Sequence, residues 1–399
     1  MNPDLARLHP YPFEKLATLK QDVQPPADRD HIALSIGEPK HPTPTIIREA
    51  LISHLDGLAR YPVTKGEPLL RETIANWLAQ RFTLTPEQIN PDNQILPVNG
   101  TREALFAFAQ CVIDRSEPAY VLMPNPFYQI YEGAALLAGA TPWYMNTTRE
   151  TSFLPDFDEV PEDVWEKCQL LYVCSPGNPS GAVINKQQFQ QLFELADKYD
   201  FIIASDECYS ELYFDEASPP PGLLEVAAAC GRDDFSRCVV FHSLSKRSNA
   251  PGLRSGFVAG DASIIEKFFK YRTYHGCAMP PAHQQASIAA WSDETHVTHN
   301  RELYREKFTA VHDILKTVMQ VAIPPASFYL WPKTDIDDTV FTRGLFAQQN
   351  VTVLPGSYLS RENHFGINPG KNHIRMALVA PLDECIDAAH RIRDFIITL

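Results

Sequence analysis

The sequence has 399 residues, 44% of them hydrophobic and 21% charged, which is ordinary for a globular protein of two or three domains. Lys and Arg number 35 against 49 Asp and Glu, and the formal net charge of −14 excludes a general affinity for nucleic acid or anionic membranes. The eight cysteines form no Cys-x-x-Cys pair and the histidines show no ligand spacing, so we expect no metal site.

The N-terminus lacks the apolar core of a signal peptide, and no run of about 18 apolar residues follows. We therefore expect a cytoplasmic protein. Its first 45 residues are expected to pack with a small C-terminal domain.

From about residue 94 to 260 the chain alternates short apolar runs with amphipathic stretches. The apolar runs predict strands at 94–98, 120–123, 170–174, 201–204, 238–241 and 256–259. Helical spacing predicts helices over 102–112 and 186–199. Nearly continuous apolar strands alternating with helices indicate an α/β fold with a mostly parallel sheet covered on both faces.

The C-terminal third has a different pattern, with helical stretches at about 262–275, 282–290, 300–320 and 382–397. Between them, "ASFYLWPK", "VTVLPG" and "HIRMALV" alternate like half-buried strands. The predicted organisation is a large domain over 46–284 and a smaller α+β domain over 285–399, with the segment 1–45 packed on it.

Polar or aromatic residues directly follow five of the predicted strands. The groups are Asn99-Gly100-Thr101, Asn125-Pro126-Phe127-Tyr128, Ser175-Pro176-Gly177-Asn178, Ser205-Asp206 and Ser243-Leu244-Ser245-Lys246. Because the carboxyl ends of parallel strands share one edge of a sheet, these groups should meet in a single crevice, where ligands bind in such folds.

The chemistry of this set matches pyridoxal 5′-phosphate. That cofactor needs a lysine for its aldehyde and a carboxylate to keep its ring nitrogen protonated, which Lys246 and Asp206 supply. It also needs an anion site and a flat apolar contact. Tyr128 can stack on the ring, and the anion site can be built from Ser243, Ser245, Arg254 and the helix start at Gly100-Thr101-Arg102.

Two other classes of protein are disfavoured because the additional motifs or domains that they need are missing. Ser243 and Lys246 match the Ser-x-x-Lys motif of penicillin-recognising hydrolases, but residues 205–207 read Ser-Asp-Glu and 64–66 read Thr-Lys-Gly, so the companion motifs are missing. A cofactor-sensing regulator would need a DNA-binding domain, for which the N-terminal segment leaves no room. Other reactions of the same cofactor, β-elimination and decarboxylation, stay open.

The motifs resemble those of fold-type I aminotransferases of class I/II, from "LSIGEP" (34–39) to "HIRMALV" (373–379). Between these lie "YPVTKGEPLLRE" (61–72), "NPFYQIY" (125–131), "SPGNPSG" (175–181), "SDECY" (205–209), "SLSK" (243–246) and "GLRSG" (252–256). All of them occur in the order and at the spacing of that family.

The resemblance implies a role for each matching residue. Lys246 would form a covalent bond to the cofactor and move the substrate's α-proton, and Asp206 would pair with the ring nitrogen. Tyr209 and Asn178 would form hydrogen bonds with the phenolic oxygen of the cofactor ring. The phosphate positions match Gly100, Thr101, Arg102, Ser243, Ser245 and Arg254.

The resemblance also places the substrate and a second subunit. Arg375 would grip the α-carboxylate with help from Asn178 and the Gly37 backbone. Tyr61 would reach the phosphate of the neighbouring subunit, so a homodimer is implied. Tyr128 stands where the family often has tryptophan, and Ser248 where many relatives have an aromatic residue.

"SLSKRSNAPGLRSGFVAGD" (243–261), "GEPKHPTP" and "RYPVTKG" are most similar to bacterial N-succinyl-diaminopimelate aminotransferases. That likeness implies transfer of an amino group from glutamate to N-succinyl-2-amino-6-oxopimelate in lysine biosynthesis. A polyanionic substrate would need a second cation, for which Lys65 and Arg247 are candidates. The alternatives are an aminotransferase for aspartate, alanine or aromatic substrates, and a C–S lyase.

Overall fold

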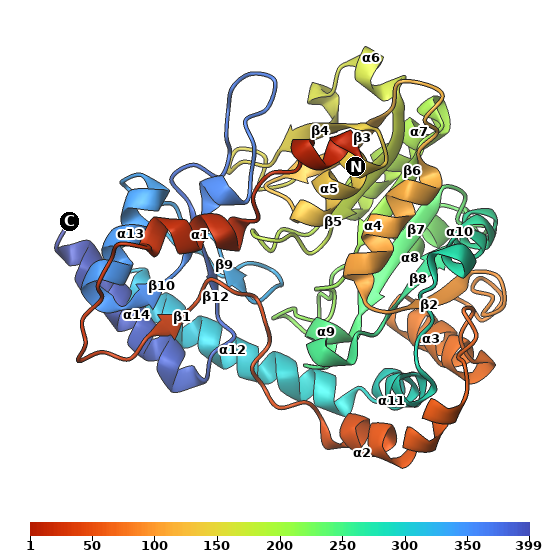
Figure 1. Ribbon diagram of the computed structural model, residues 1–399, viewed down its shortest axis with the longest axis horizontal. Coiled ribbons are helices and arrows are strands. Elements are labelled where there is room, and N and C mark those ends of the chain that lie inside the picture. The colour runs from red at the N-terminus through yellow and green to blue at the C-terminus, as the bar shows by residue number, and fades with distance from the viewer.

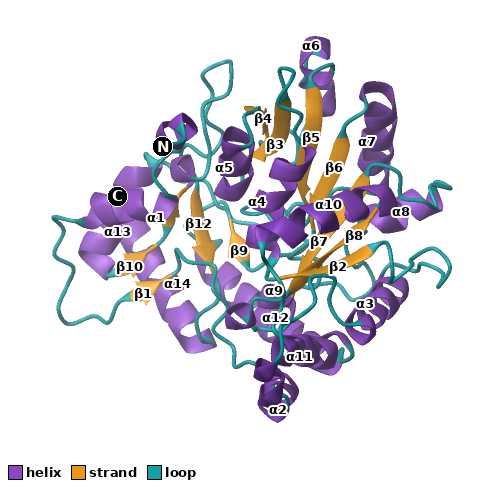
Figure 2. Ribbon diagram, turned by 45° about the vertical axis from the view of Figure 1, so that its right-hand side comes forward, coloured by secondary structure: helices purple, strands orange, loops and turns teal.

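A seven-stranded sheet with the order β2-β8-β7-β6-β5-β3-β4 forms the centre of the large half of the molecule (Figures 1 and 2). The computed structural model describes all residues, 1–399. The strands of this sheet are β2 (Ile95–Val98), β3 (Tyr120–Asn125), β4 (Thr141–Asn146), β5 (Cys168–Cys174), β6 (Ile202–Asp206), β7 (Cys238–Ser243) and β8 (Gly256–Gly260).

The directions of the strands place the five polar strand ends at one edge. Neighbouring strands are parallel throughout the row β7-β6-β5-β3-β4. Strand β8 is antiparallel to both β7 and β2, so β2 runs in the same direction as the parallel set. The predicted mostly parallel sheet is confirmed, with β8 as the one reversed strand.

Helices cover both faces of the sheet, as predicted. One face packs against α4 (Thr101–Val112), α5 (Gln129–Leu137) and α10 (Ala262–His275). The other packs against α3 (Pro68–Arg81), α6 (Glu162–Trp165), α7 (Lys186–Tyr199), α8 (Leu223–Ala229) and α11 (Pro281–Trp291).

Helix α7 shows why the sequence pattern located these helices well. Asn185 accepts a hydrogen bond from the backbone of Gln188, whose side chain accepts one from the Asn185 backbone in return, so both free amides are capped. Phe189 and Phe193 lie on its buried face. The chain leaves the helix at Asp200, in the left-handed conformation.

The C-terminal part forms a smaller layer beside this sheet (Figure 2). A three-stranded antiparallel sheet has the order β11-β12-β9. Its strands are β9 (Tyr329–Leu330), β11 (Leu354–Pro355) and β12 (Ile374–Ala377), and the helices are α12 (Thr295–Leu315), α13 (Asp338–Gln349) and α14 (Leu382–Ile397). These elements share a core of their own that includes Phe308, Leu345 and Ile392.

The N-terminal segment crosses both parts of the molecule (Figure 1). Its first turn, Pro3–Arg7, contacts α5, whereas α1 (Pro12–Lys20) contacts α13. Strand β1 (Ile32–Ala33) pairs in parallel with β10 (Val351–Thr352), and α2 (Thr45–Ser53) packs on α11. The expected domain boundary at residue 285 falls within α11.

Several elements were not predicted, among them α2, α3, α5, β4 and α13. No helix combines the length and the apolar character needed to cross a membrane.

Candidate active site

The five polar strand ends meet at a cavity of about 490 Å³ between the two parts of the molecule. Its walls come from the large sheet, from β12 and from the N-terminal segment, including Tyr11 and Ile36. The residues predicted to bind the cofactor or the substrate's α-carboxylate all line it, except Gly100 and Tyr61. A volume of this size is typical of a small-molecule or cofactor site.

Lys246 lies on α9 (Leu244–Arg247), the single turn that follows β7. The side chain of Ser243 caps this turn by accepting a hydrogen bond from the Ser245 amide at 3.1 Å. The Nζ of Lys246 donates to the Gly37 carbonyl at 2.5 Å. Burial lowers the pKa of Lys246 to about 8, so a minority of this amine is already neutral near physiological pH.

Asp206, at the end of β6, is a buried carboxylate that forms no ion pair within the chain. One oxygen accepts a hydrogen bond from the Tyr131 hydroxyl at 2.6 Å, and the other accepts one from the Cys208 amide at 3.3 Å. Burial raises the pKa of Asp206, partly offset by these hydrogen bonds. A buried carboxylate held only by neutral donors is poised for a cation that comes from elsewhere.

Arg375, on β12, faces the same cavity. Its two terminal nitrogens donate to Asn178 Oδ1 at 3.0 Å and to the Ser35 carbonyl at 2.8 Å. The guanidinium stacks on the Tyr329 ring at 4.4 Å, and its buried Nε has no partner. The arginine is therefore fixed in place without a counter-charge.

Gly37 needs to be a glycine at this position. A Cβ atom there would lie 2.0 Å from the Tyr329 hydroxyl. The absence of a side chain lets the backbone of this segment approach both Lys246 and Arg375.

The expected anion site lies at the N-terminus of α4. Gly100 caps this helix with a φ of +84°, and a Cβ atom there would lie 2.2 Å from a terminal nitrogen of Arg254. Thr101, Ser243, Ser245 and Arg254 line the adjoining wall. Free amides of a helix start beside a guanidinium form a ready anion site.

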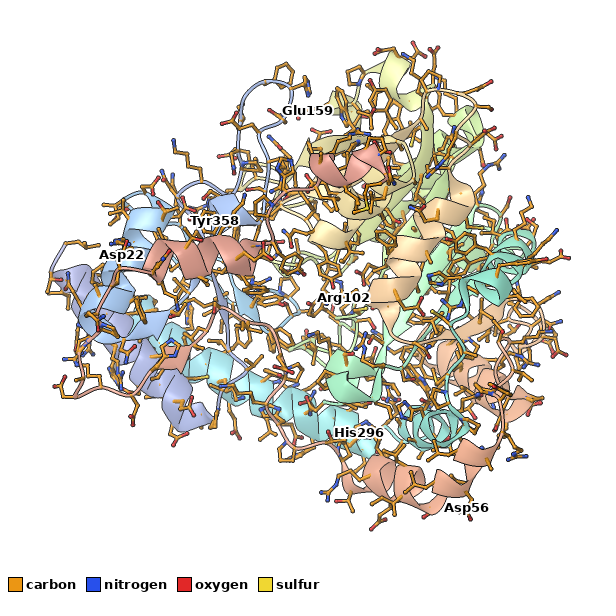
Figure 3. All side chains as sticks on the ribbon, in the orientation of Figure 1. Asp22, Asp56, Arg102, Glu159, His296 and Tyr358 are labelled. Carbon is orange, nitrogen blue, oxygen red and sulfur yellow. The ribbon has the colours of Figure 1, made fainter.

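Two tyrosines border the space between Lys246 and the anion site. Tyr128 accepts a hydrogen bond from Arg102 Nε at 2.8 Å, which holds both side chains at the wall. The hydroxyls of Tyr209 and Tyr329 lie 3.2 Å apart, and burial raises the pKa of Tyr209 well above its ordinary value. Figure 3 shows Arg102 at the end of α4 that faces the C-terminal part.

Three residues that the sequence suggested as ligand contacts lie outside the cavity. Tyr61 is fully exposed, in the loop after the short turn Leu55–Ala59. Lys65 does not line the cavity, and Arg247 is unsuitable as a substrate contact, contrary to our expectation. Its side chain is buried and donates to the Ala290 carbonyl and to Glu294.

Ser248, the position that departs from the resembling family, does not reach the cavity either. It is fully buried and shares a 2.8 Å hydrogen bond with His296 Nε2. Its hydroxyl also accepts from Arg247 at 3.1 Å. The serine at position 248 therefore contacts residues packed behind α9 and does not border the cavity.

The most important residue that the sequence interpretation missed is Tyr131. It lies three positions after Tyr128, at the start of α5, and residues three apart on a helix share a face. This three-residue spacing from Tyr128 could have identified Tyr131 as a site residue. Cys208, whose Sγ lies 3.1 Å from Thr101 Oγ1, and Tyr329 were also missed.

A lysine, an unpaired acid, an anion site and a fixed arginine around one cavity define a site for a phosphorylated cofactor and an amino acid. Comparison with known proteins agrees. The family model for aminotransferase class I and II matches residues 29–385, and the chain therefore belongs to this family.

Relatives and solved structures span nearly the whole chain. The LL-diaminopimelate aminotransferase of Dehalococcoides mccartyi is 31% identical over 98% of this chain and 97% of its own length. An aminotransferase from Neisseria meningitidis is 49% identical with a TM-score of 0.94, covering 98% of this chain and 99% of that one. A probable N-succinyldiaminopimelate aminotransferase from Thermus thermophilus is 26% identical with a TM-score of 0.82, covering 96% and 100%.

Members of this family use pyridoxal 5′-phosphate, and the residues around the cavity fit that group. Asp206 accepts hydrogen bonds only from neutral groups, so it lacks the cation that a protonated ring nitrogen would supply, and Lys246 offers an amine with a lowered pKa. The glycine at position 100 keeps the anion site open to Arg254.

Proposed function

We propose that the protein is a cytoplasmic, homodimeric, pyridoxal phosphate-dependent aminotransferase that transfers the amino group of glutamate to N-succinyl-2-amino-6-oxopimelate. The observation that carries the catalytic part is the meeting of Lys246, Asp206 and Arg375 in one cavity, where each hydrogen-bonds to neutral groups only. Charged groups buried in this way are expected where a ligand completes the electrostatics.

In this proposal the cofactor's phosphate would be held by the backbone amides at the start of α4, over Gly100, Thr101 and Arg102, and by Ser243, Ser245 and Arg254. Lys246 would bond to its aldehyde carbon, and Asp206 would keep the ring nitrogen protonated. Tyr128, Tyr209 and Asn178 would contact the ring. When bound, the cationic ring takes up the electron pair left on the substrate's α-carbon by loss of a proton.

The chain's own residues move that proton and orient the substrate. The amine of Lys246, neutral above a pKa of about 8, takes the proton from the α-carbon and returns it. Arg375, held by Asn178 and Ser35, binds the α-carboxylate with a fixed guanidinium plane. The backbone of Gly37 closes this side of the site.

The distal part of the substrate would extend toward the cavity mouth. Arg102 lines the cavity and uses only its Nε, toward Tyr128, in the hydrogen bonds of the chain. Its remaining donors support recognition of a succinyl carboxylate and replace Arg247 in that role.

A second candidate is LL-diaminopimelate itself, because curated relatives at 30–31% identity carry that name. The exposed carboxylate of Glu38 also lines the cavity and forms no ion pair, which would suit a free distal ammonium group.

The proposed dimer rests on the surface around Tyr61. Exposed apolar side chains gather on α2 and the following turn and loop, namely Ile52, Leu55, Leu58 and Val63. A second copy would cover this surface and receive Tyr61 at its phosphate.

A half-reaction screen tests the proposal. Protein loaded with pyridoxal phosphate is mixed with glutamate, LL-diaminopimelate, N-succinyl-LL-diaminopimelate, aspartate or alanine, and the loss of the cofactor's visible absorbance is followed. We expect fast bleaching with glutamate and with the N-succinyl compound. Bleaching by LL-diaminopimelate alone would establish the second candidate, and release of ammonia and pyruvate from cysteine-like substrates would indicate a lyase.

A further inference from the structure

A buried lysine without an acid lies behind the active site. Lys307, on α12, is 3% exposed and takes part in no ion pair. Its Nζ contacts His41 Nε2 at 2.6 Å and the Val379 carbonyl at 3.4 Å. The titratable groups around it are the Cys385 thiol, Lys40 and Glu384, and burial lowers its pKa to about 8.

Lys307 begins a chain of hydrogen bonds in which each donor and acceptor can be assigned in only one way. His41 Nδ1 lies 2.8 Å from Asn300 Oδ1, which already accepts from Asn249 Nδ2 at 2.9 Å. Because that oxygen only accepts, His41 must carry its proton on Nδ1. Its Nε2 is then an acceptor, so the ammonium of Lys307 is the donor.

The chain ends at the backbone of the helix that carries the proposed catalytic lysine. Asn300 Nδ2 donates weakly to the Lys246 carbonyl at 3.4 Å. Asn249, just after α9, is also held from the other side, where Thr43 Oγ1 donates to its carbonyl at 2.7 Å. The segment with His41 and Thr43 is thus fastened to the end of α9.

The same segment begins at the active site. Four residues before His41, the Gly37 carbonyl accepts the Lys246 ammonium at 2.5 Å. The contacts therefore close a ring that runs from Lys246 Nζ through Gly37 and His41 to Asn300 and back to the Lys246 backbone.

We propose that His41 and Lys307 are positioning residues, which hold the Gly37 segment against α9 and so keep the amine of Lys246 desolvated and correctly placed. The inference rests on the role proposed for Lys246. Neither His41 nor Lys307 lines the cavity, so their effect on Lys246 passes through the ring of contacts.

The test compares His41→Leu, which removes both ring nitrogens, with His41→Gln. The glutamine can accept from Lys307 through Oε1 and donate to Asn300 through Nε2, which preserves the direction of the chain. Lys307→Met removes the cation, and Glu306→Gln, on the exposed face of α12, is the matched control.

The first measurement is acetylation of Lys246 by acetic anhydride in cofactor-free protein over a range of pH, read by peptide mass spectrometry. Because burial is the main cause of its lowered pKa, we expect His41→Leu and Lys307→Met to raise the midpoint by at least about half a pH unit. His41→Gln should return it most of the way, and Glu306→Gln should leave it unchanged.

The second measurement is the half-reaction with glutamate. We expect a rate at saturating donor at least about tenfold lower in His41→Leu, with a smaller change in KM, and recovery in His41→Gln. Unchanged acetylation midpoint and rate in His41→Leu would overturn the inference, as would His41→Gln being as impaired as His41→Leu.

Two further outcomes are distinguishable. If His41→Leu does not fold, Thr43→Val must raise the midpoint in the same direction, and an unchanged midpoint there overturns the inference. If Lys246→Ala retains full activity the proposed function fails, whereas the acetylation midpoints still report on the ring of contacts.

Discussion

Replacing Arg375 by alanine tests the substrate side of the proposed site. The change removes a buried guanidinium that the chain holds with two hydrogen bonds, at 3.0 Å and 2.8 Å, and with the Tyr329 ring. It leaves Lys246, Asp206 and the anion site untouched, so the loss should fall on recognition of the amino acid.

The magnitude follows from the burial of the guanidinium. Removing one partner of a buried charge pair costs about 2–5 kcal/mol. Since Arg375 is 4% exposed, solvent screens it little, and we expect about 3–4 kcal/mol, which is a loss of about 10²–10³-fold in kcat/KM. Arg375→Lys keeps the charge but not the planar fork and should lose less.

Stopped-flow absorbance with glutamate measures this loss, and equilibrium titration with the cofactor supplies the reference. Arg393→Ala, at an exposed position of α14, is the matched control. A loss of less than about tenfold in kcat/KM, or a parallel loss of cofactor affinity, would refute the assigned role of Arg375.

The other expected outcomes concern the cofactor. Lys246→Ala should abolish turnover yet still bind the cofactor through its phosphate, which equilibrium dialysis checks; full turnover would contradict the assignment. Asp206→Asn should slow the half-reaction at least about tenfold, because an amide cannot keep the ring nitrogen protonated, and a normal rate would remove that role. Covalent loading of the cofactor requires the neutral amine, so its rate should fall about tenfold for each pH unit below about 8 and level off above it; a flat profile would contradict the lowered pKa of Lys246. Tyr61→Ala should weaken cofactor binding, and mixing it with Lys246→Ala should restore activity if the tyrosine serves the other subunit.

The sheet and the residues at its strand ends could be predicted because both depend on local sequence, whereas Tyr209, Arg375 and Gly37 came from the family resemblance. Apolar runs that end in Gly, Asn or Ser mark strand ends, and parallel direction brings those ends together. Strand β4 was missed because Pro142 and half-exposed side chains weaken its pattern, and an edge strand tolerates both. Helix α13 was missed because Thr339, Val340 and Gly344 lower its helix propensity.

Contacts between distant segments could not be predicted in this way. Arg247 was nominated as a second cation for a polyanionic substrate. Successive residues of a helix point about 100° apart, so the turn that aims Lys246 into the cavity aims Arg247 into the core. The partner of Asp206 and the buried ring through His41 likewise depend on how elements pack, which periodicity does not report.

In the proposed enzyme, the unpaired carboxylate of Asp206 should make the cofactor-free polypeptide the less stable form. Desolvation of that acid weighs against folding until a cation from the ligand offsets it. Vitamin B6 supply should therefore set the melting temperature through mass action, and it should also set how quickly cellular proteases remove the chain. A starved cell would lose the enzyme itself as well as its turnover.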